Sequence, residues 1–455
     1  MWIAGVASIL IALGAVAVLV SLRLSPGSHV QPAARARVSL PQPIPQPITR
    51  TSAGAQVAWL WLQSQSEQPY LVAIDPGGRL VTRLDQSTAQ ELAGNYGIWR
   101  SADGSAIFAV GPDQVTAYSA LDGTVQGTYA RAPGDVVGDA FSQDGHWLAI
   151  LLLTGGLQLE VIDLRTGASQ VLPVAHDPNA SLPGMSCSGN SGGSCAGMVA
   201  WGLAVFAPDS LHLYTLSDWG GPARLTAFSL AGGKLGQTAT AVDGQNSSQF
   251  STCGAPAMAA RVIAAGKTLV AFCHMDGSVW FFDLGTLANS GVVRAQQGNP
   301  FWNSPIFTPD GRLLYVQQVP GFGNSMQVID LTSRRLLGPV STPTKVDQSG
   351  PFAGLITDAY AGGVVSTVPL SPDGLKLYSA TSDGVMVLRV PDLKPLAKLA
   401  PGLKTGEVWI SGDGRTIYAT SDDGKRILVV RSDGSGQKSV PLPSLAGGFV
   451  ASEHG

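Results

Sequence analysis

Two short segments of the chain place a histidine close to a carboxylate, and they are the first candidates for chemistry. They read His176-Asp177 and His274-Met275-Asp276. Two imidazoles and two carboxylates suit zinc or a harder divalent cation, provided that the two loops meet in the fold. Solvated loop residues are the alternative, and the sequence alone assigns neither a metal nor a cofactor.

A Gly/Ser-rich segment contains a serine that could belong to a nucleophile motif. Gly189–Gly193 reads Gly-Asn-Ser-Gly-Gly and resembles the Gly-Asp-Ser-Gly-Gly of chymotrypsin-like proteases, with Asn190 replacing the acid. A nucleophile elbow needs a strand before the serine and a helix after it, and this loop composition predicts neither. Ala264–Thr268 likewise has Arg261 where a phosphate-binding loop needs glycine. We therefore predict no catalytic residue.

The chain contains four cysteines: Cys187, Cys195, Cys253 and Cys273. An even number is consistent with disulfides in an oxidising compartment. Of the three possible connectivities, we favour Cys187–Cys195 within one loop and Cys253–Cys273 between neighbouring segments. Reduced thiols remain the alternative, and the absence of a Cys-x-x-Cys pair makes a metal site less favoured.

The elements that hold these residues follow from a repeat. A turn of the type Ser-Pro-Asp-Gly, followed by a β-branched or aromatic strand, centres on Asp103, Asp144, Asp209, Asp310, Asp373 and Asp413, with a degenerate copy at Gly266. Proline fixes φ, aspartate bonds the local backbone and glycine supplies positive φ, so each copy is a tight turn. The shortest spacing is about 40 residues, the period of propeller blades.

The pattern predicts an all-β propeller of about eight four-stranded blades over residues 51–451. Gly447–Ala451 could supply the inner strand that the first repeat lacks. Seven blades remain possible if Thr51–Asp85 is not a true blade. The charge-poor, Gly-rich composition, with 13% charged residues and 56 glycines, fits many tight turns between buried strands.

The repeat resembles the WD40-like and YVTN-type propellers of extracytoplasmic bacterial proteins across nearly all of residues 51–450. The matching piece is Phe-Thr-Pro-Asp-Gly-Arg-Leu-Leu-Tyr-Val at 307–316, followed by Val-Ile-Asp-Leu at 328–331. The Gly-His and Trp-Asp pairs of true WD40 blades are missing. The resemblance implies the fold and leaves the function open.

An uncharged segment at residues 2–22 precedes the first charge at Arg23. As a helix, it spans about 32 Å, enough for a bilayer core. We predict a transmembrane anchor at 2–22 and a Pro-rich linker at 23–50, whose Pro41–Pro47 run favours polyproline II. A cleaved signal peptide is the alternative, and the bare start leaves a truncated N-terminus open.

The side of the membrane follows from two opposed signals. Arg23, Arg35 and Arg37 favour the cytoplasm after the span, whereas the four cysteines favour an oxidising exterior. Large folded domains translocate largely regardless of charge. We predict a single-pass protein of the cell membrane with an extracytoplasmic propeller.

Three insertions, at about 175–200, 240–257 and 342–364, all lie in links between the outer strand of one blade and the inner strand of the next. They therefore decorate one face of the disc, and loops on a rigid scaffold commonly bind ligands. Capping of the blade ends is the alternative. The candidate binding residues of this decorated face are Tyr96, His176, Asp177, Trp219, His274, Asp276, Phe301, Trp302 and Tyr360.

The functional expectation from the sequence is a non-enzymatic scaffold or sensor that binds a protein or a cell-surface polymer. A net charge of −3 provides no basic footprint for nucleic acid. The alternative is a lactonase-type hydrolase with a metal at the channel mouth. Apolar or small residues at the expected inner-strand starts, namely Gly97-Ile98, Val199-Ala200 and Val364-Val365, favour the scaffold.

Overall fold

The structure of the chain is a computed structural model. It describes residues 53–63, 70–84, 98–174, 202–217, 224–242, 257–294, 302–341 and 369–449, with short gaps at 102, 112, 155, 264–265, 274–276, 319–324 and 382. Among these residues, no helix is long and apolar enough to cross a membrane. The predicted anchor at 2–22 and linker at 23–50 lie outside them.

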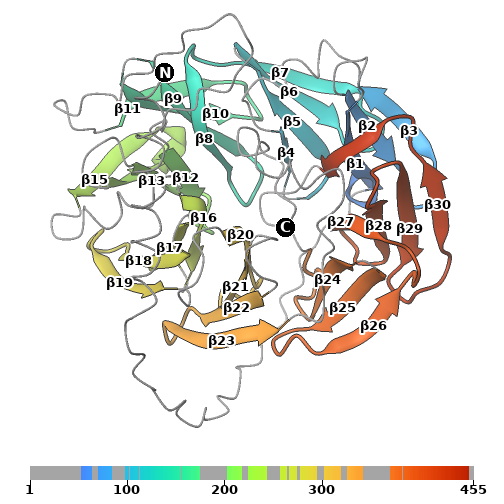
Figure 1. Cartoon of the computed structure of the whole chain (residues 1–455). Coiled ribbons are helices and arrows are strands. Elements are labelled where there is room, and N and C mark those ends of the chain that lie inside the picture. Colours follow the sequence, from blue (N-terminus) through green and yellow to red (C-terminus); the bar gives the residue numbers. More distant parts are fainter. Residues whose placement is uncertain are drawn as a thin grey trace, which may run out of the picture. The chain divides into compact units, whose positions relative to one another are not determined.

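Eight antiparallel sheets form a ring (Figure 1). We number them as blades 1 to 8 and letter the strands of each blade A to D from the axis outwards. Blades 1 to 4 contain η1 (Ala53–Gln56), β1 (Ala58–Gln63), β2 (Tyr70–Ile74), β3 (Leu80–Leu84), β4 (Ile98–Arg100), β5 (Ala106–Val110), β6 (Gln114–Ser119), β7 (Val125–Ala130), β8 (Asp135–Phe141), β9 (Trp147–Leu153), β10 (Leu157–Asp163), β11 (Ser169–Pro173), β12 (Gly202–Phe206), β13 (His212–Ser217), β14 (Arg224–Ser229), η2 (Ala231–Gly233) and β15 (Gly236–Val242).

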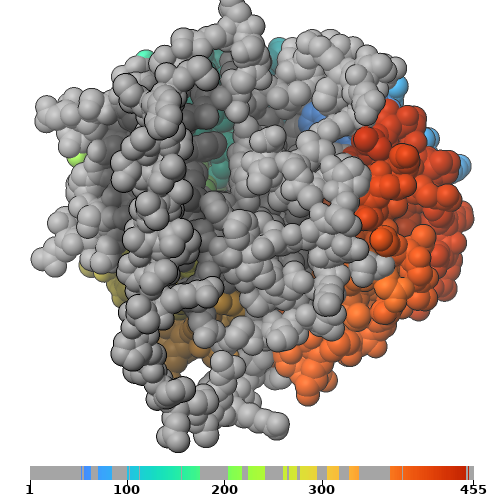
Figure 2. Space-filling view, viewed as in Figure 1, coloured from blue at the N-terminus to red at the C-terminus, as the bar shows by residue number. Residues whose placement is uncertain are grey.

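Blades 5 to 8 continue in the same order around the ring. They contain β16 (Ala257–Ile263), β17 (Thr268–Cys273), β18 (Ser278–Asp283), β19 (Asn289–Arg294), β20 (Trp302–Phe307), β21 (Leu313–Gln318), β22 (Ser325–Asp330), β23 (Arg335–Ser341), β24 (Lys376–Thr381), β25 (Gly384–Arg389), β26 (Pro395–Leu399), β27 (Thr405–Ile410), β28 (Thr416–Ser421), β29 (Arg426–Arg431) and β30 (Lys438–Pro441). Blade 7 has three described strands, and a bridge from Leu370 to Leu377 marks its inner edge. In the space-filling view, the residues of blades 7 and 8 form one continuous surface (Figure 2).

The ring is closed by the last strand of the chain. β31 (Leu445–Phe449) pairs with β1 and becomes strand A of blade 1. Tyr70 Oη donates to Ser444 Oγ at 3.0 Å, and Tyr418 Oη donates to the Gln56 carbonyl at 2.7 Å across the same seam. The predicted closure and the count of eight blades are therefore confirmed, and the first repeat is a true blade.

The repeated turns join strands A and B, as the sequence predicts. In blade 2, Ser101 Oγ donates to Asp103 Oδ1 at 2.7 Å and accepts the Ala106 N–H at 2.9 Å, while Gly104 has φ +72°. Blade 3 repeats the arrangement with Ser142 and Asp144. The A–B and C–D turns lie on one face of the disc, which we call the turn face; it is opposite the decorated face.

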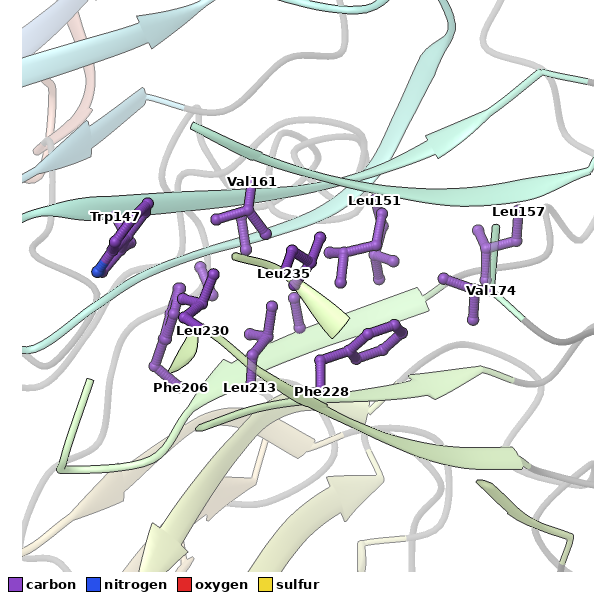
Figure 3. Close-up of a cluster of buried hydrophobic side chains, with 14 of the residues drawn as sticks. Trp147, Leu151, Leu157, Val161, Val174, Phe206, Leu213, Phe228, Leu230 and Leu235 are labelled. Carbon is purple, nitrogen blue, oxygen red and sulfur yellow. The ribbon is translucent and has the colours of Figure 1, made fainter. Parts of the chain in front are cut away.

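Packing between neighbouring sheets makes the core. Between blades 3 and 4, a cluster of buried side chains includes Trp147, Leu151, Phe206 and Phe228 (Figure 3). Full burial of one such side chain contributes roughly 1.5–3 kcal/mol. Similar clusters fill the other described junctions, so each blade is held by its neighbours and the inner strands are fixed around the axis.

Candidate functional site

Most of the predicted binding residues lie outside the described part of the chain. They are Tyr96, His176, Asp177, Trp219, His274, Asp276, Phe301 and Tyr360. Trp302 is the first residue of β20, where its backbone pairs with Gln318. The binding role of the decorated face therefore stays a prediction.

Only one of the four cysteines is described. Cys273 ends β17 and is completely buried. Cys187, Cys195 and Cys253 lie outside the described residues, which contain no free cysteine. The connectivity of the four cysteines stays a prediction.

Charged side chains occur on the inner strands, where the sequence indicates apolar or small residues. Asp135 and Asp139 lie on β8, Arg261 on β16 and Glu407 on β27. The expected starts at Val199-Ala200 and Val364-Val365 lie outside the described residues, and β12 begins at Gly202. The three starts named from the sequence belong to blades 2, 4 and 7, so they say nothing of the charged residues on the inner strands of blades 3, 5 and 8.

Glu407 occupies an irregular part of its strand. The pairing of β27 with β28 shifts register between Thr405 and Val408, which marks a β-bulge. The Glu407 N–H donates to Thr420 Oγ1 at 2.9 Å instead of joining the regular ladder. Bulges re-aim side chains and are common beside active sites. Here the bulge directs the carboxylate towards β31, the inner strand of blade 1.

The carboxylate of Glu407 has a single described hydrogen-bond donor. The N–H of Phe449, in β31, donates to its Oε2 at 3.2 Å. Although the residue as a whole is half-buried, burial of the carboxyl end raises its pKa to about 7, and the one backbone hydrogen bond only partly offsets this. A carboxyl group with this pKa can both accept and donate a proton at neutral pH.

Two inner-strand arginines bind backbone carbonyls. The Arg100 Nη2 donates to Val57 O at 2.6 Å, and its guanidinium lies 4.9 Å from the centre of the Trp409 ring. The Arg261 guanidinium donates to Thr308 O and Pro309 O at 3.1 and 3.2 Å. These hydrogen bonds join the inner strand of blade 2 to blade 1 and the inner strand of blade 5 to blade 6. Burial lowers the pKa of Arg261.

A sequence signal for the inner-strand charges does exist. Arg100 stands immediately before its turn serine, where the repeat otherwise has Phe141, Leu370 or Ile410. Counting back six residues from the turn aspartate Asp413 reaches Glu407, within the expected inner strand. The bulge that turns Glu407 has no comparable sequence signal.

The turn face contains a cleft of about 380 Å³ between blades 3 and 4. It is lined by two turns of blade 3, which include Asp144 and Asp163, and by Gly232 and Gly233 of blade 4. Among the described residues, no group of three or more histidine, cysteine or acidic side chains could hold a metal ion. The cleft and Glu407 are therefore the two candidate sites.

The comparisons with known proteins establish the fold. No protein-family model and no curated protein matches the chain. The solved structure of the dihydro-heme d1 dehydrogenase NirN in complex with DHE matches at 17% identity, over 91% of this chain and 80% of that chain, with a TM-score of 0.57. Hydrazine synthase of Kuenenia stuttgartiensis matches at 17% identity, over 75% of this chain and 96% of that chain, with a TM-score of 0.47.

These findings correct the functional expectation. NirN is an enzyme by name, and the inner strands of this chain carry the acids Asp135, Asp139 and Glu407, which the sequence did not lead us to expect there. The expectation that the propeller is a non-enzymatic scaffold is therefore wrong. The lactonase-type alternative receives no support either. The chain is similar to NirN in its all-β, eight-bladed propeller fold.

Proposed function

We propose that this propeller is an enzyme in which Glu407 transfers protons beside the central axis. The observation that carries the proposal is the pKa of about 7 of an inner-strand carboxyl group. Efficient general acid–base catalysis needs a group whose pKa lies near the working pH, and such perturbed groups concentrate at functional sites. The fold shared with the dehydrogenase NirN over most of the chain supports an enzymatic role.

A contact between described residues holds the carboxyl group of Glu407 in place. Its Oε2 is held by the Phe449 N–H, which orients the carboxyl group against β31. No described cation forms an ion pair with it, so the proton remains on the carboxyl group up to neutral pH. A substrate at the axis would exchange its proton with this carboxyl group.

An iron tetrapyrrole, as in the name of NirN, does not fit the described residues at the axis. The described histidines, His146 and His212, lie in or next to the A–B turns of blades 3 and 4. Each Nδ1 contacts an aspartate, at 3.1 Å for His146 and 2.6 Å for His212. Neither belongs to blade 8, which contains Glu407, or to blade 1, which contacts it.

Carbodiimide labelling of the folded protein tests the proposal, because the reagent activates protonated carboxyl groups. We expect Glu407 to couple to glycinamide near neutral pH, with labelling that falls as pH rises through about 7. Tryptic mass spectrometry reads the result on the peptide 405–415. The same peptide contains the exposed Asp413, whose coupling at about pH 5 is the internal control for the reagent. Glu407→Gln should remove the label at 407 alone.

Failure to label Glu407 while Asp413 reacts would mean that the carboxyl group is sealed from small molecules. Glu407 would then be a structural contact between β27 and β31, and the proposed catalytic role would be refuted. Labelling of Glu407 only after the protein unfolds would have the same meaning.

We also propose that the propeller is tethered to the cell membrane by residues 2–22 and lies outside the cytoplasm. The charge-free apolar segment and the even number of cysteines support this placement. The full-length chain should sediment with membranes and resist salt extraction, whereas a chain lacking 2–22 should not. Protease added to intact cells should cleave the propeller, and protection of the propeller would contradict its outside placement.

A further inference from the structure

The cleft between blades 3 and 4 lies on the turn face, away from both Glu407 and the decorated face. Its volume of about 380 Å³ is at the lower end of the range for small-molecule sites. Trp147 and Leu230 are buried and provide an apolar floor, and Leu211 is exposed at the edge. The polar rim includes Asp144, His146, Asp163 and Arg165. The cleft thus combines a floor of apolar side chains with a few polar groups, the usual composition of a ligand site.

One wall of the cleft is formed by the A–B turns of blades 3 and 4, and a hydrogen bond joins these two turns. Ser210 of blade 4 has φ +58°, where the turns of most other blades have glycine, and is 3% exposed. Its hydroxyl accepts the N–H of Asp144 from blade 3 at 3.1 Å. A side chain at this φ is uncommon because it is strained, and here it joins the turns of the two blades that form the cleft.

The opposite wall is fixed by Gln170. Its Nε2 donates to Gly233 O at 2.7 Å, and its Oε1 accepts the Leu235 N–H at 2.9 Å. Both amide atoms of the side chain are therefore used in holding the blade 4 turn against β11. With both walls fixed, a ligand would not need to order the site on binding, which favours affinity.

Trp147 offers an unused hydrogen-bond donor at this cleft. The residue is 6% exposed, and its indole Nε1–H donates to no residue that the structure describes. Figure 3 shows the ring nitrogen turned away from the other labelled side chains of the cluster. The indole N–H is open to solvent at the cleft, so it can donate to an acceptor on a bound ligand without breaking a contact within the protein.

The charges of the rim select the kind of ligand. Hydrogen bonds to the turn backbone and side chains keep the pKa values of Asp144 and Asp163 low despite partial burial, so both are ionised at neutral pH. They would repel an anion. The Arg165 guanidinium, 6.0 Å from the centre of the Trp147 ring, and the indole N–H are donors that a cation cannot use. A neutral ligand with many hydroxyl groups can donate to the carboxylates and accept from the donors.

We propose that this cleft is a saccharide-binding site that holds one or two sugar residues. Hydroxyl groups donate to the carboxylates of Asp144 and Asp163, and a sugar oxygen accepts the indole N–H of Trp147. The site is independent of the proposed catalytic role of Glu407, which lies in blade 8. A propeller with such a site could hold a glycan on its turn face while chemistry occurs at the axis.

Indole NMR of the full-length chain, labelled with ¹⁵N-tryptophan, tests the proposal. The Trp147 resonance is assigned by its loss in Trp147→Phe. We expect a saturable downfield shift of this resonance with at least one of cellobiose, chitobiose and maltose, with a millimolar Kd. Lysine methyl ester and inorganic phosphate serve as cationic and anionic probes and should cause no saturable shift.

Two variants locate the ligand. The double variant D144N/D163N keeps the oxygen acceptors that hold both turns but loses the two charges, and it should weaken binding at least tenfold. Asp103→Asn, in the equivalent turn of blade 2, should leave the Kd unchanged. The proposal is overturned if none of the three disaccharides shifts the resonance saturably, if only the cation or the anion does, or if Asp103→Asn weakens binding as much as the double variant.

Discussion

Gly384→Ala is expected to lower the free energy of unfolding by about 4 kcal/mol. Gly384 begins β25 with φ +99°, a conformation that costs a residue with a side chain. A Cβ here would collide with the carbonyl oxygen of Leu399 and lie 2.8 Å from that of Ala400. Both residues are buried, so neither carbonyl can withdraw without disturbing blade 7.

The matched control is Gly402→Ala, in the next turn of the chain. Gly402 has φ +86°, but nothing lies within 4 Å of the added Cβ. It should lose only the conformational preference, about 1 kcal/mol. Urea unfolding followed by tryptophan fluorescence measures both variants. Equal losses would show that backbone conformation, rather than the approach of the two carbonyls, requires glycine at position 384.

Arg131→Met is expected to destabilise the propeller by about 3–5 kcal/mol. Arg131 is 7% exposed and donates to three carbonyls, Gly111 O at 2.6 Å, Ala132 O at 3.0 Å and Gly134 O at 2.9 Å. It therefore holds the link between blades 2 and 3. Arg165→Met, at an exposed turn, should cost about 1 kcal/mol or less.

The effect of Arg131→Met should also depend on pH because of Glu160. This buried carboxylate accepts the Ala132 N–H at 3.0 and 2.9 Å. Burial raises its pKa, and the charge of Arg131 limits the rise. A raised pKa in the folded state means that the contribution to stability is present at low pH and is lost as pH rises. Without Arg131, the pKa of Glu160 in the folded state rises further. The variant should therefore lose more free energy of unfolding at about pH 8, where Glu160 must ionise, than at about pH 5.

A double-mutant cycle separates the two contributions. Glu160→Gln keeps an oxygen for the Ala132 N–H but removes the charge. In the Glu160→Gln background, Arg131→Met should cost about 1 kcal/mol less and lose its additional pH dependence. Strict additivity of the two substitutions, or an unchanged pH profile, would show that Arg131 acts only through its three carbonyl contacts.

The repeat predicted the fold because its residues act locally. Proline, aspartate and glycine fix each A–B turn through φ and short side-chain contacts, and the structure has these turns at Asp103, Asp144 and Asp413. The closing strand was also predictable, because an incomplete first repeat requires its missing strand from the other end of the chain. Both inferences depend on the order of residues rather than on distant contacts.

The candidate sites were less predictable because they depend on contacts between blades. The pKa of Glu407 follows from a bulge and from the approach of Phe449, 42 residues further along the chain. The cleft depends on Ser210, whose positive φ and bond to Asp144 connect two repeats. Composition at the expected strand starts could not reveal either arrangement, and it led to the incorrect non-enzymatic expectation.

The closing strand also sets the order of events during synthesis. β1 and β31 are about 390 residues apart in the chain, so at 5–20 residues per second the ribosome needs about 20–80 s to supply the partner of β1. Until then, blade 1 lacks its inner strand and exposes an unpaired edge, the kind of surface that invites association with other chains. Glu407 likewise gains the N–H of Phe449 only at this last step. The nascent ring would therefore benefit from a chaperone that protects blade 1 until translation ends.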